Sequence, residues 1–496
     1  MRSVRDNAFV NFIWRFAERC GAQLVQFVVT IILARILMPE DYGTIALINV
    51  VLSVLSVFIN CGLGIALIQK KDADDIDFST VFYTNIIFCT VLYLLLFLAA
   101  PLIADFYDMP QMTELVRLVG LTLIISGVKN VQSAYVSRNM MFKRFFFATL
   151  GGTIGAAIVG ISMAVAGYGV WALIAQSLFN NAVDTIVLWV TVKWRPKKYF
   201  SFARLKGLFS YGWKMLASSL LDTLYNNVRT LIIGKLYSST DLAYYNKGKT
   251  WPNLFIENIN SSIDSVLLPT MAKEQEHSER VKGMTRRAIK TSTYAMAPIM
   301  MGLAFVAEPL TRLVLTEKWL PCVPYMYIFC IVYMFYPIHT ANLNAIKAMG
   351  RSDLFLKLEV IKKVVGLLAI ISTMHFGVMA MAYSLIFTSI ASQIINSWPN
   401  RKLLNYGYLE QLKDILPGIL LAVFMGACVN LVTLFHLPDV FTLLIQVPLG
   451  AVIYIGLSKL LKLDSFEYLW GIIKVVILKG TEVRRGNEDY RTEDYQ

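Results

Sequence analysis

The sequence predicts an all-α membrane protein that crosses a bilayer about fourteen times, and three observations support this fold class. Charged residues make up only 16% of the 496 residues, against about 25% in soluble domains. Several runs without any charged residue are as long as the roughly 20 residues that a helix needs to cross the hydrocarbon core. They include residues 44–69, 81–104 and 440–458. The connections between apolar runs are alternately rich in Lys and Arg and nearly free of them.

The charge-free runs place the helices one by one. The long run 145–183 is divided at Gly167-Tyr168-Gly169, where a tight turn would join two helices. The expected helices lie near residues 9–36, 41–66, 81–105, 113–136, 145–166, 169–192, 211–236, 241–268, 289–315, 322–346, 355–375, 377–399, 414–435 and 439–461. The shorter apolar run 468–478 cannot cross a bilayer and is expected to form an interfacial helix.

The distribution of basic residues predicts the orientation of these helices. Lys and Arg cluster in every second connection, among them residues 193–206 and 273–287, and the intervening connections hold little beyond Lys318. Because basic loops stay in the cytoplasm, both termini are predicted to be cytoplasmic. The net charge of +13 is therefore explained by membrane orientation, and no nucleic-acid partner is expected.

An internal repeat divides the chain. Residues 32–43 (ILARILMPEDYG) match residues 232–245 (IIGKLYSSTDLAYY), with Asp41 corresponding to Asp241. Six helices are therefore expected to occur twice in the same orientation. The repeat predicts a six-helix lobe in residues 1–195, a second lobe in 205–402, two appended helices in 413–461 and a cytoplasmic tail in 462–496.

Polar side chains form stripes along the first two helices of each predicted lobe. Unpaired polar groups in lipid cost several kcal/mol, so a continuous stripe favours a water-filled cavity between the lobes. For any single residue, a network that only holds the helices together is the alternative. The candidate lining residues are Gln23, Gln26, Asn49, Asn60, Asn253 and Asn260.

The charged members of these stripes favour an anionic solute. The candidate substrate-binding cations are Arg15, Arg19, Lys214, Arg229, Lys247 and Lys249. Arg binds phosphate through its planar set of donors, which suits a phosphate-bearing substrate. Glu257, Asp264 and Asp222 are candidates for ion coupling, since the first two are expected to be buried and able to hold a proton or sodium. Neutralising the nearby cations is their alternative role.

The sequence offers no catalytic or cofactor motif. It has no phosphate-binding Gly-rich loop, no Ser/His/Asp set in a plausible frame and no nucleotide-hydrolysing domain. Its six cysteines lie in apolar stretches, and its four histidines are not paired at metal-binding spacing. We therefore expect a transporter and not an enzyme, with no cofactor and no metal, coupled to a proton or sodium gradient.

Five short motifs resemble a known family. They are LARILMPEDYG (33–43), YYNKG (244–248), PTMAK (269–273), TEKWLP (316–321) and NAIKAMGR (344–351). In this order they resemble the polysaccharide-flippase branch of the multidrug/oligosaccharidyl-lipid/polysaccharide exporter superfamily, over about residues 8–460. The resemblance implies two six-helix lobes, alternating access, and an undecaprenyl-diphosphate-linked oligosaccharide moved from the cytoplasmic to the outer leaflet.

Three other functions remain open at the level of sequence. A multidrug or cation antiporter of the same superfamily would prefer an acidic or aromatic cavity, and a peptidoglycan-precursor flippase would share the cationic one. A membrane glycan polymerase would place its catalytic groups in a large outer loop, and no such loop is predicted.

The resemblance also sets expectations for location and partners. It implies a multi-pass protein of the bacterial inner membrane that acts in surface polysaccharide biosynthesis (O-antigen, capsule or exopolysaccharide). The expected partners are the lipid-linked oligosaccharide, membrane lipid, and the polysaccharide polymerase and export proteins. A monomer is expected.

Overall fold

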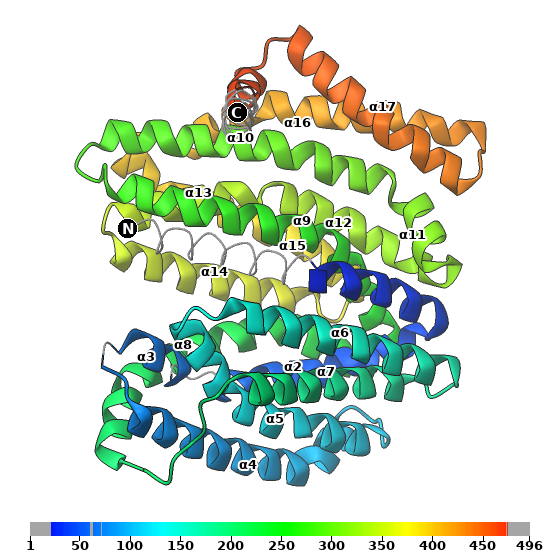
Figure 1. Ribbon diagram of the computed structural model, residues 1–496. Helices are drawn as coiled ribbons and strands as arrows, with labels where there is room; N and C mark the ends of the chain where they lie inside the picture. Colours follow the sequence, from blue (N-terminus) through cyan, green and yellow to red (C-terminus); the bar gives the residue numbers. More distant parts are fainter. Residues whose placement is uncertain (1–20, 60–62, 71, 473, 475–496) are drawn as a thin grey trace, which may run out of the picture. The chain divides into compact units, whose positions relative to one another are not determined.

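The computed structural model describes residues 21–59, 63–70, 72–472 and 474 (Figure 1). Throughout these residues the regular structure is helical and contains no strand, as the sequence predicts. The chain divides into two compact units, Met1–Tyr244 and Tyr245–Gln496, and the boundary falls inside the helix α9. The four predicted domains, with their boundary near residues 195–205, stay a prediction.

The first unit is built from the helix Gly21–Ile36 and seven further helices before α9. These are α2 (Pro39–Ile59), α3 (Leu63–Gln69), α4 (Asp75–Phe106), α5 (Met112–Arg138), α6 (Phe142–Val165), α7 (Val170–Thr191) and α8 (Phe202–Leu236). The predicted break at residues 167–169 is confirmed, because α6 ends just before it and α7 begins just after it. Gly167 and Gly169 have φ of 85° and 52°, which glycine adopts without strain.

The repeat is visible in the way two equivalent helices begin. In α2 the carboxylate of Asp41 accepts a hydrogen bond from the backbone N–H of Met38 (3.1 Å). In α9 (Ser239–Ala272) the carboxylate of Asp241 accepts from the backbone N–H of Ser238 (3.3 Å), whose hydroxyl accepts from the N–H of Asp241 (3.0 Å). Carboxylates in the first turn satisfy free N–H groups and favour helix initiation.

Small residues allow α2 to approach its neighbours in the first unit. A Cβ atom at Gly43 would lie 1.7 Å from the carbonyl oxygen of Ser239, and one at Gly234 of α8 would lie 2.2 Å from Leu47 Cδ2. Both glycines are therefore required by packing. Close approach at small residues is the usual way in which membrane helices associate.

A charged cluster joins α4 to α8 at one end of the first unit. Asp74 caps α4 and forms an ion pair with Arg204, which also lies 3.2 Å from the buried carboxylate of Asp77. The Arg204 guanidinium holds the pKa of Asp74 well below its usual range. Lys197 forms a further ion pair with Asp75 (2.6 Å). The basic connection 193–206 is thus anchored on the acidic start of α4.

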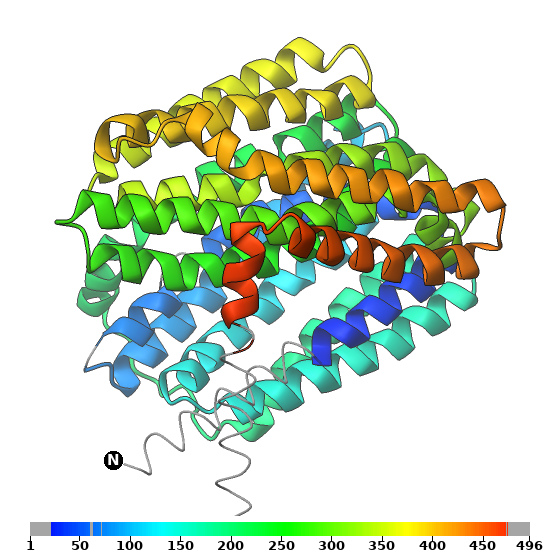
Figure 2. The ribbon, with the colours of Figure 1, turned by 90° about the horizontal axis from the view of Figure 1, so that it is seen from above.

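The second unit contains the rest of α9 and the helices that follow it. They are α10 (Ser278–Phe305), α11 (Ala307–Leu315), η1 (Glu317–Cys322), α12 (Val323–Met334), α13 (Tyr336–Ala348), α14 (Ser352–Thr373), α15 (Val378–Leu403), α16 (Tyr408–Asn430), η2 (Leu431–Phe435) and α17 (Asp439–Leu460). Figures 1 and 2 both show α16 and α17 side by side. Residues 464–472 form a further helix, so the described part of the predicted interfacial segment is helical.

Two predicted helices are interrupted, which corrects their expected boundaries. The helix expected at 41–66 is described as α2 and α3, and residues 60–62 between them lie outside the described residues. The one expected at 289–315 consists of α10 and α11, which meet at an angle of 65°. The one expected at 322–346 is divided between α12 and α13, where Pro337 occupies the first turn of α13. Proline has no N–H to donate and therefore favours a new helix start over continuation.

By length and composition, eight helices of the described residues could each span a membrane, or nine if the bent pair α10 and α11 is one span. The predicted count of fourteen also includes the shorter helix Gly21–Ile36 and the more polar helices α5, α8, α9 and α14. Such helices span a membrane when their polar side faces protein or water. The number fourteen and the cytoplasmic position of both termini stay predictions.

Candidate functional site

The predicted cationic residues are only partly within the described structure. Arg15, Arg19 and Asn60 lie outside the described residues, and Lys214 belongs to α8 but its side chain is not described. Arg229 lies on α8 in the first unit and is 8% exposed. Lys247 and Lys249 lie on α9 in the second unit and are described separately below.

In the first unit the candidate polar residues are mainly exposed. Gln23, Gln26, Asn49 and Asp222 all have exposed side chains. The stripes of α2 and α8 meet at one point, where Asn227 Nδ2 donates to Ser53 Oγ (3.3 Å). Polar side chains of α2 and α8 thus partly satisfy each other, and others remain accessible.

The two lysines of α9 have different environments. Lys247 is 6% exposed, and its Nζ lies 5.1 Å from the centroid of the Trp319 ring. A cation over an aromatic face is attracted by the ring quadrupole, so Trp319 compensates part of the cost of burying this ammonium group. Lys249, two residues later, is exposed. Lys249 can therefore meet a solute directly, whereas Lys247 is held inside the helix packing.

The expectation that Glu257 and Asp264 are buried is wrong, because both side chains are exposed. Their predicted alignment holds, since α9 is helical through both positions. Glu257 accepts a hydrogen bond from Asn253 Nδ2 (2.5 Å), and Asn260 lies half-buried between the two carboxylates. The role of Glu257, Asp264 and Asp222 in ion coupling stays a prediction.

The exposed polar face of α9 is long. Its members extend over more than four helical turns and are Lys249, Thr250, Glu257, Asn258, Ser261, Ser262, Asp264 and Ser265. If α9 crosses the membrane, contact of this face with lipid would be strongly unfavourable. It would therefore require water, or a polar substrate, along most of its length.

A partly buried ion pair in the first unit was not predicted. Lys129 of α5 and Asp184 of α7 form a 2.8 Å ion pair, with side chains 27% and 12% exposed. Gly152 of α6 makes room for it, because a Cβ there would lie 2.8 Å from Asp184 Oδ1 and 2.9 Å from Asn180 Oδ1. Asn180 and Asp184 are polar residues in an otherwise apolar helix, which is a signal visible in the sequence. Their pairing with Lys129 is not visible there, since Lys129 and Asp184 are 55 positions apart.

A buried amide network in the second unit was also not predicted. Asn342 of α13 and Gln411 of α16 exchange two hydrogen bonds (2.8 and 3.0 Å), and Asn400 Nδ2 of α15 donates to Asn342 Oδ1 (2.6 Å). All three side chains are fully buried. Gln411 also donates to the carbonyl oxygen of Tyr406 (3.3 Å), whose hydroxyl donates to Asp414 (2.8 Å). This network joins three helices of the second unit.

Metal-ligating side chains do not gather anywhere in the described part of the chain. No group of three or more His, Cys, Asp and Glu residues there has a geometry that could hold a metal ion.

The fold is shared with solved membrane-protein structures. The structure is similar to that of lipid II flippase MurJ in an inward closed conformation, with a TM-score of 0.73 and 15% identity, covering 91% of this chain and 98% of that one. It is also similar to an inward-facing multidrug resistance MATE family transporter of the MOP superfamily (TM-score 0.60, 14% identity, 79% and 98% covered). The chain is thus a multi-span helical membrane protein with the fold of that superfamily.

Within this class the sequence defines the family. Residues 32–324 match the family described as "Polysaccharide biosynthesis protein", and the chain belongs to it. A similar protein is teichuronic acid biosynthesis protein TuaB of Bacillus subtilis (25% identity; 81% of this chain and 84% of that protein). Another is succinoglycan biosynthesis transport protein ExoT of Rhizobium meliloti (24% identity; 62% of this chain and 63% of that protein). The family resemblance seen in the sequence motifs is confirmed.

Proposed function

We propose that the protein is a flippase that moves an undecaprenyl-diphosphate-linked oligosaccharide from the cytoplasmic to the outer leaflet of the bacterial inner membrane. Membership of the polysaccharide biosynthesis family carries this proposal. The names of similar proteins, a succinoglycan transport protein and a lipid II flippase, support transport of a lipid-linked sugar over its synthesis. The protein is then a transporter and not an enzyme.

The polar faces of α8 and α9 give this function a physical basis. A sugar diphosphate is strongly hydrated and cannot cross hydrocarbon without polar partners. Exposed hydroxyl and amide groups of α9 can replace water around the sugar, and Lys249 can meet the diphosphate. Arg15, Arg19, Lys214, Arg229 and Lys247 are the further cations of the proposal. The undecaprenyl chain would remain in lipid.

The energy for directional transport comes, in this proposal, from a proton or sodium gradient. Glu257, Asp264 and Asp222 are exposed carboxylates on the polar faces of α9 and α8 and are available to an ion from water. A transported cation would then share the water-filled pathway with the substrate. No cofactor and no metal are needed for such a cycle.

Deleting the gene tests this function. We expect the deletion strain to accumulate one lipid-linked oligosaccharide on the cytoplasmic face of the inner membrane and to lose the corresponding surface polysaccharide. Complementation with the gene should restore both. Loss of the polymer together with accumulation of a fully translocated, unpolymerised oligosaccharide would instead assign the protein to polymerisation.

The same strain tests the proposed cations. Replacing Arg15, Arg19, Lys214 or Arg229 with alanine should reduce complementation, because losing one desolvated phosphate contact costs roughly 10- to 100-fold in affinity. The matched control is Lys198→Gln, which removes a positive charge from an exposed connection. The amount of each variant in the membrane is measured in parallel. Normal transport by all four variants, at parental protein levels, would contradict their assignment to the pathway.

A further inference from the structure

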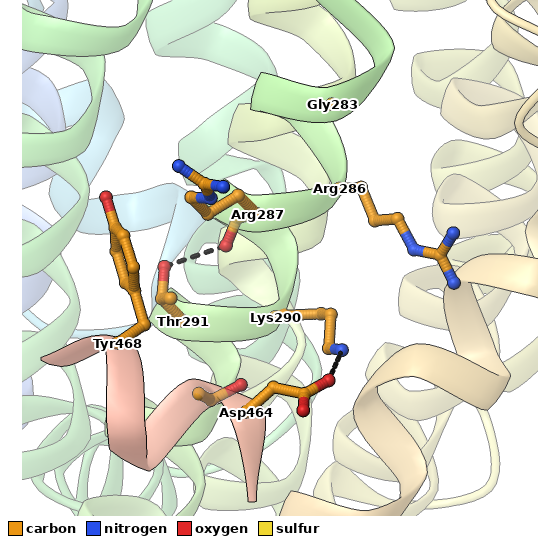
Figure 3. Close-up of a pocket in the computed structure, with 8 residues that line it drawn as sticks. Gly283, Arg286, Arg287, Lys290, Thr291, Asp464 and Tyr468 are labelled. Atoms are coloured by element: carbon orange, nitrogen blue, oxygen red, sulfur yellow. Dashed lines mark hydrogen bonds and ion pairs between the residues drawn. The ribbon is translucent and has the colours of Figure 1, made fainter.

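A basic pocket lies at one end of the second unit, between the first half of α10 and the helix 464–472. Its volume is about 290 Å³, close to the lower limit of about 300 Å³ for small-molecule sites. The side chains that line it include Arg286, Arg287, Lys290, Thr291, Asp464 and Tyr468 (Figure 3). It is therefore large enough for a headgroup, but not for a whole lipid or an oligosaccharide.

Two of the three cations in this pocket are anchored by carboxylates. Lys290 Nζ lies 2.9 Å from Asp464 Oδ2, which fastens the helix 464–472 to α10. Lys290 holds the pKa of Asp464 below its usual range, so Asp464 is ionised at neutral pH. Arg286 extends away from Tyr468 and forms an ion pair with Asp414 of α16 (2.7 Å) (Figure 3).

Arg287 is the cation that is available to a ligand. Its guanidinium carbon lies 4.8 Å from the centroid of the Tyr468 ring, and no carboxylate among the described residues lies within ion-pairing distance. Stacking on an aromatic ring fixes the plane of a guanidinium group and leaves the N–H groups at its edge able to donate. The hydroxyl of Thr291 lies beside it and donates to the Arg287 carbonyl (2.8 Å).

A second basic pocket adjoins the first. Its volume is about 190 Å³, it shares Lys290, Asp464 and Ser465 with the first, and it adds Lys413 and Lys462. The positive charge is thus continuous on both sides of the Lys290–Asp464 ion pair. Within the two pockets the cations outnumber the carboxylates, which are Asp414 and Asp464.

Exposed apolar side chains lie near the pocket, beside the charged ones. Tyr468, Trp470 and Ile472 are exposed on the helix 464–472, and Leu460 and Leu461 are exposed at the end of α17. An exposed helix that combines aromatic and aliphatic side chains with nearby lysines is typical of a segment lying in the membrane interface. A basic pocket at that depth is beside the phosphates of the lipid headgroups.

We propose that this pocket binds the phosphate of an anionic phospholipid headgroup, with Arg287 as its principal donor. Arg287 forms charge-assisted hydrogen bonds to the phosphate oxygens, and Lys290 and Lys413 add positive potential. The acyl chains lie along the exposed apolar side chains of α17 and the helix 464–472. Bound lipid thereby fastens this helix to α10, together with the Lys290–Asp464 ion pair. This site is separate from the proposed pathway for the transported substrate.

The test measures lipid binding to the purified full-length protein in detergent. Phosphatidylglycerol, phosphatidylcholine and inorganic phosphate are titrated separately, and bound lipid is counted by native mass spectrometry. We expect the parent to bind phosphatidylglycerol in preference to phosphatidylcholine. Arg287→Gln should weaken phosphatidylglycerol binding about 10- to 100-fold, as loss of a charge-assisted contact does. Arg287→Lys should weaken it less, because it keeps the charge and loses only the planar fork.

Arg280→Gln is the matched control. Arg280 lies on the same helix, its side chain is 64% exposed, and it pairs with Glu274 outside the pocket. This control should bind phosphatidylglycerol within about twofold of the parent, since exposed ion pairs contribute little. Melting of each variant in lipid-free detergent verifies folding, and if Arg287→Gln is unstable, Arg287→Lys decides. Equal binding by parent and Arg287 variants, or equal binding of both lipids, would overturn the proposal. Displacement of the lipid by millimolar inorganic phosphate would assign the site to free phosphate.

Discussion

Replacing Lys129 with glutamine is expected to destabilise the first unit by about 3 kcal/mol, near the lower limit for breaking a buried ion pair because Lys129 is partly exposed. The substitution leaves the carboxylate of Asp184 without its cation at a position where it is 12% exposed. Asp184 Oδ1 already has no hydrogen-bond partner among the described residues, so no neighbouring donor is in place to compensate. The midpoint of thermal unfolding in detergent measures the effect.

A buried cysteine provides the readout. Cys89 of α4 is fully buried beside Gly127 of α5, two residues from Lys129. In a variant with Cys89 as its only cysteine, reaction with a thiol dye reports opening of the packing between α4 and α5, beside Lys129. The double variant Lys129→Gln with Asp184→Asn should recover most of the lost stability, because no unpaired charge remains. A single variant as stable as the parent would mean that Asp184 reaches water or another cation.

Replacing Asn342 with leucine is expected to destabilise the second unit by about 1–3 kcal/mol, the cost of one unsatisfied buried polar group. Gln411 Oε1 would lose its donor in a fully buried environment. Gln411 Nε2 would keep the Tyr406 carbonyl, and Asn400 Nδ2 would keep the backbone carbonyl of residue 342. The reaction of a thiol dye with buried Cys330, as the only cysteine of the variant, measures opening of this unit.

The control for this network is Thr340→Val on the same helix. Thr340 is half-buried, and its replacement keeps the side-chain shape without leaving any member of the amide network unpaired. It should change stability by less than about 1 kcal/mol. If Asn342→Leu is tolerated as well as Thr340→Val, the amide network makes no net contribution to stability.

The positions of most helices could be predicted because a bilayer imposes one simple requirement on each of them. A helix that crosses lipid must be apolar over a fixed length, and runs such as 81–104 meet this requirement without reference to the rest of the chain. The boundaries predicted for α6 and α7 were accurate because Gly167 and Gly169 mark the turn chemically. The family could be recognised because its motifs occur in the expected order along the chain.

Hydropathy was less informative outside the hydrocarbon core and inside the bundle. The first turns of α8 and α10 carry Arg204 and Arg280, so the apolar pattern begins well after the helix does. The 65° bend between α10 and α11 depends on packing, to which composition gives no access. The partners of Asp184 and Asn342 lie 55 and 69 positions away. A single sequence shows that these residues are polar, and the fold is needed to show what satisfies them.

Flipping by the purified protein tests the central proposal most directly. The protein is reconstituted into vesicles that contain a fluorescent undecaprenyl-diphosphate oligosaccharide, with a proton or sodium gradient imposed in parallel samples. The fraction of label in the outer leaflet is followed with a membrane-impermeant quencher. We predict rapid, protein-dependent transfer between leaflets that an imposed gradient accelerates and that the cation variants of α8 slow. Transfer no faster than in protein-free vesicles, with folded protein present, would contradict the proposal that this protein is a lipid-linked oligosaccharide flippase.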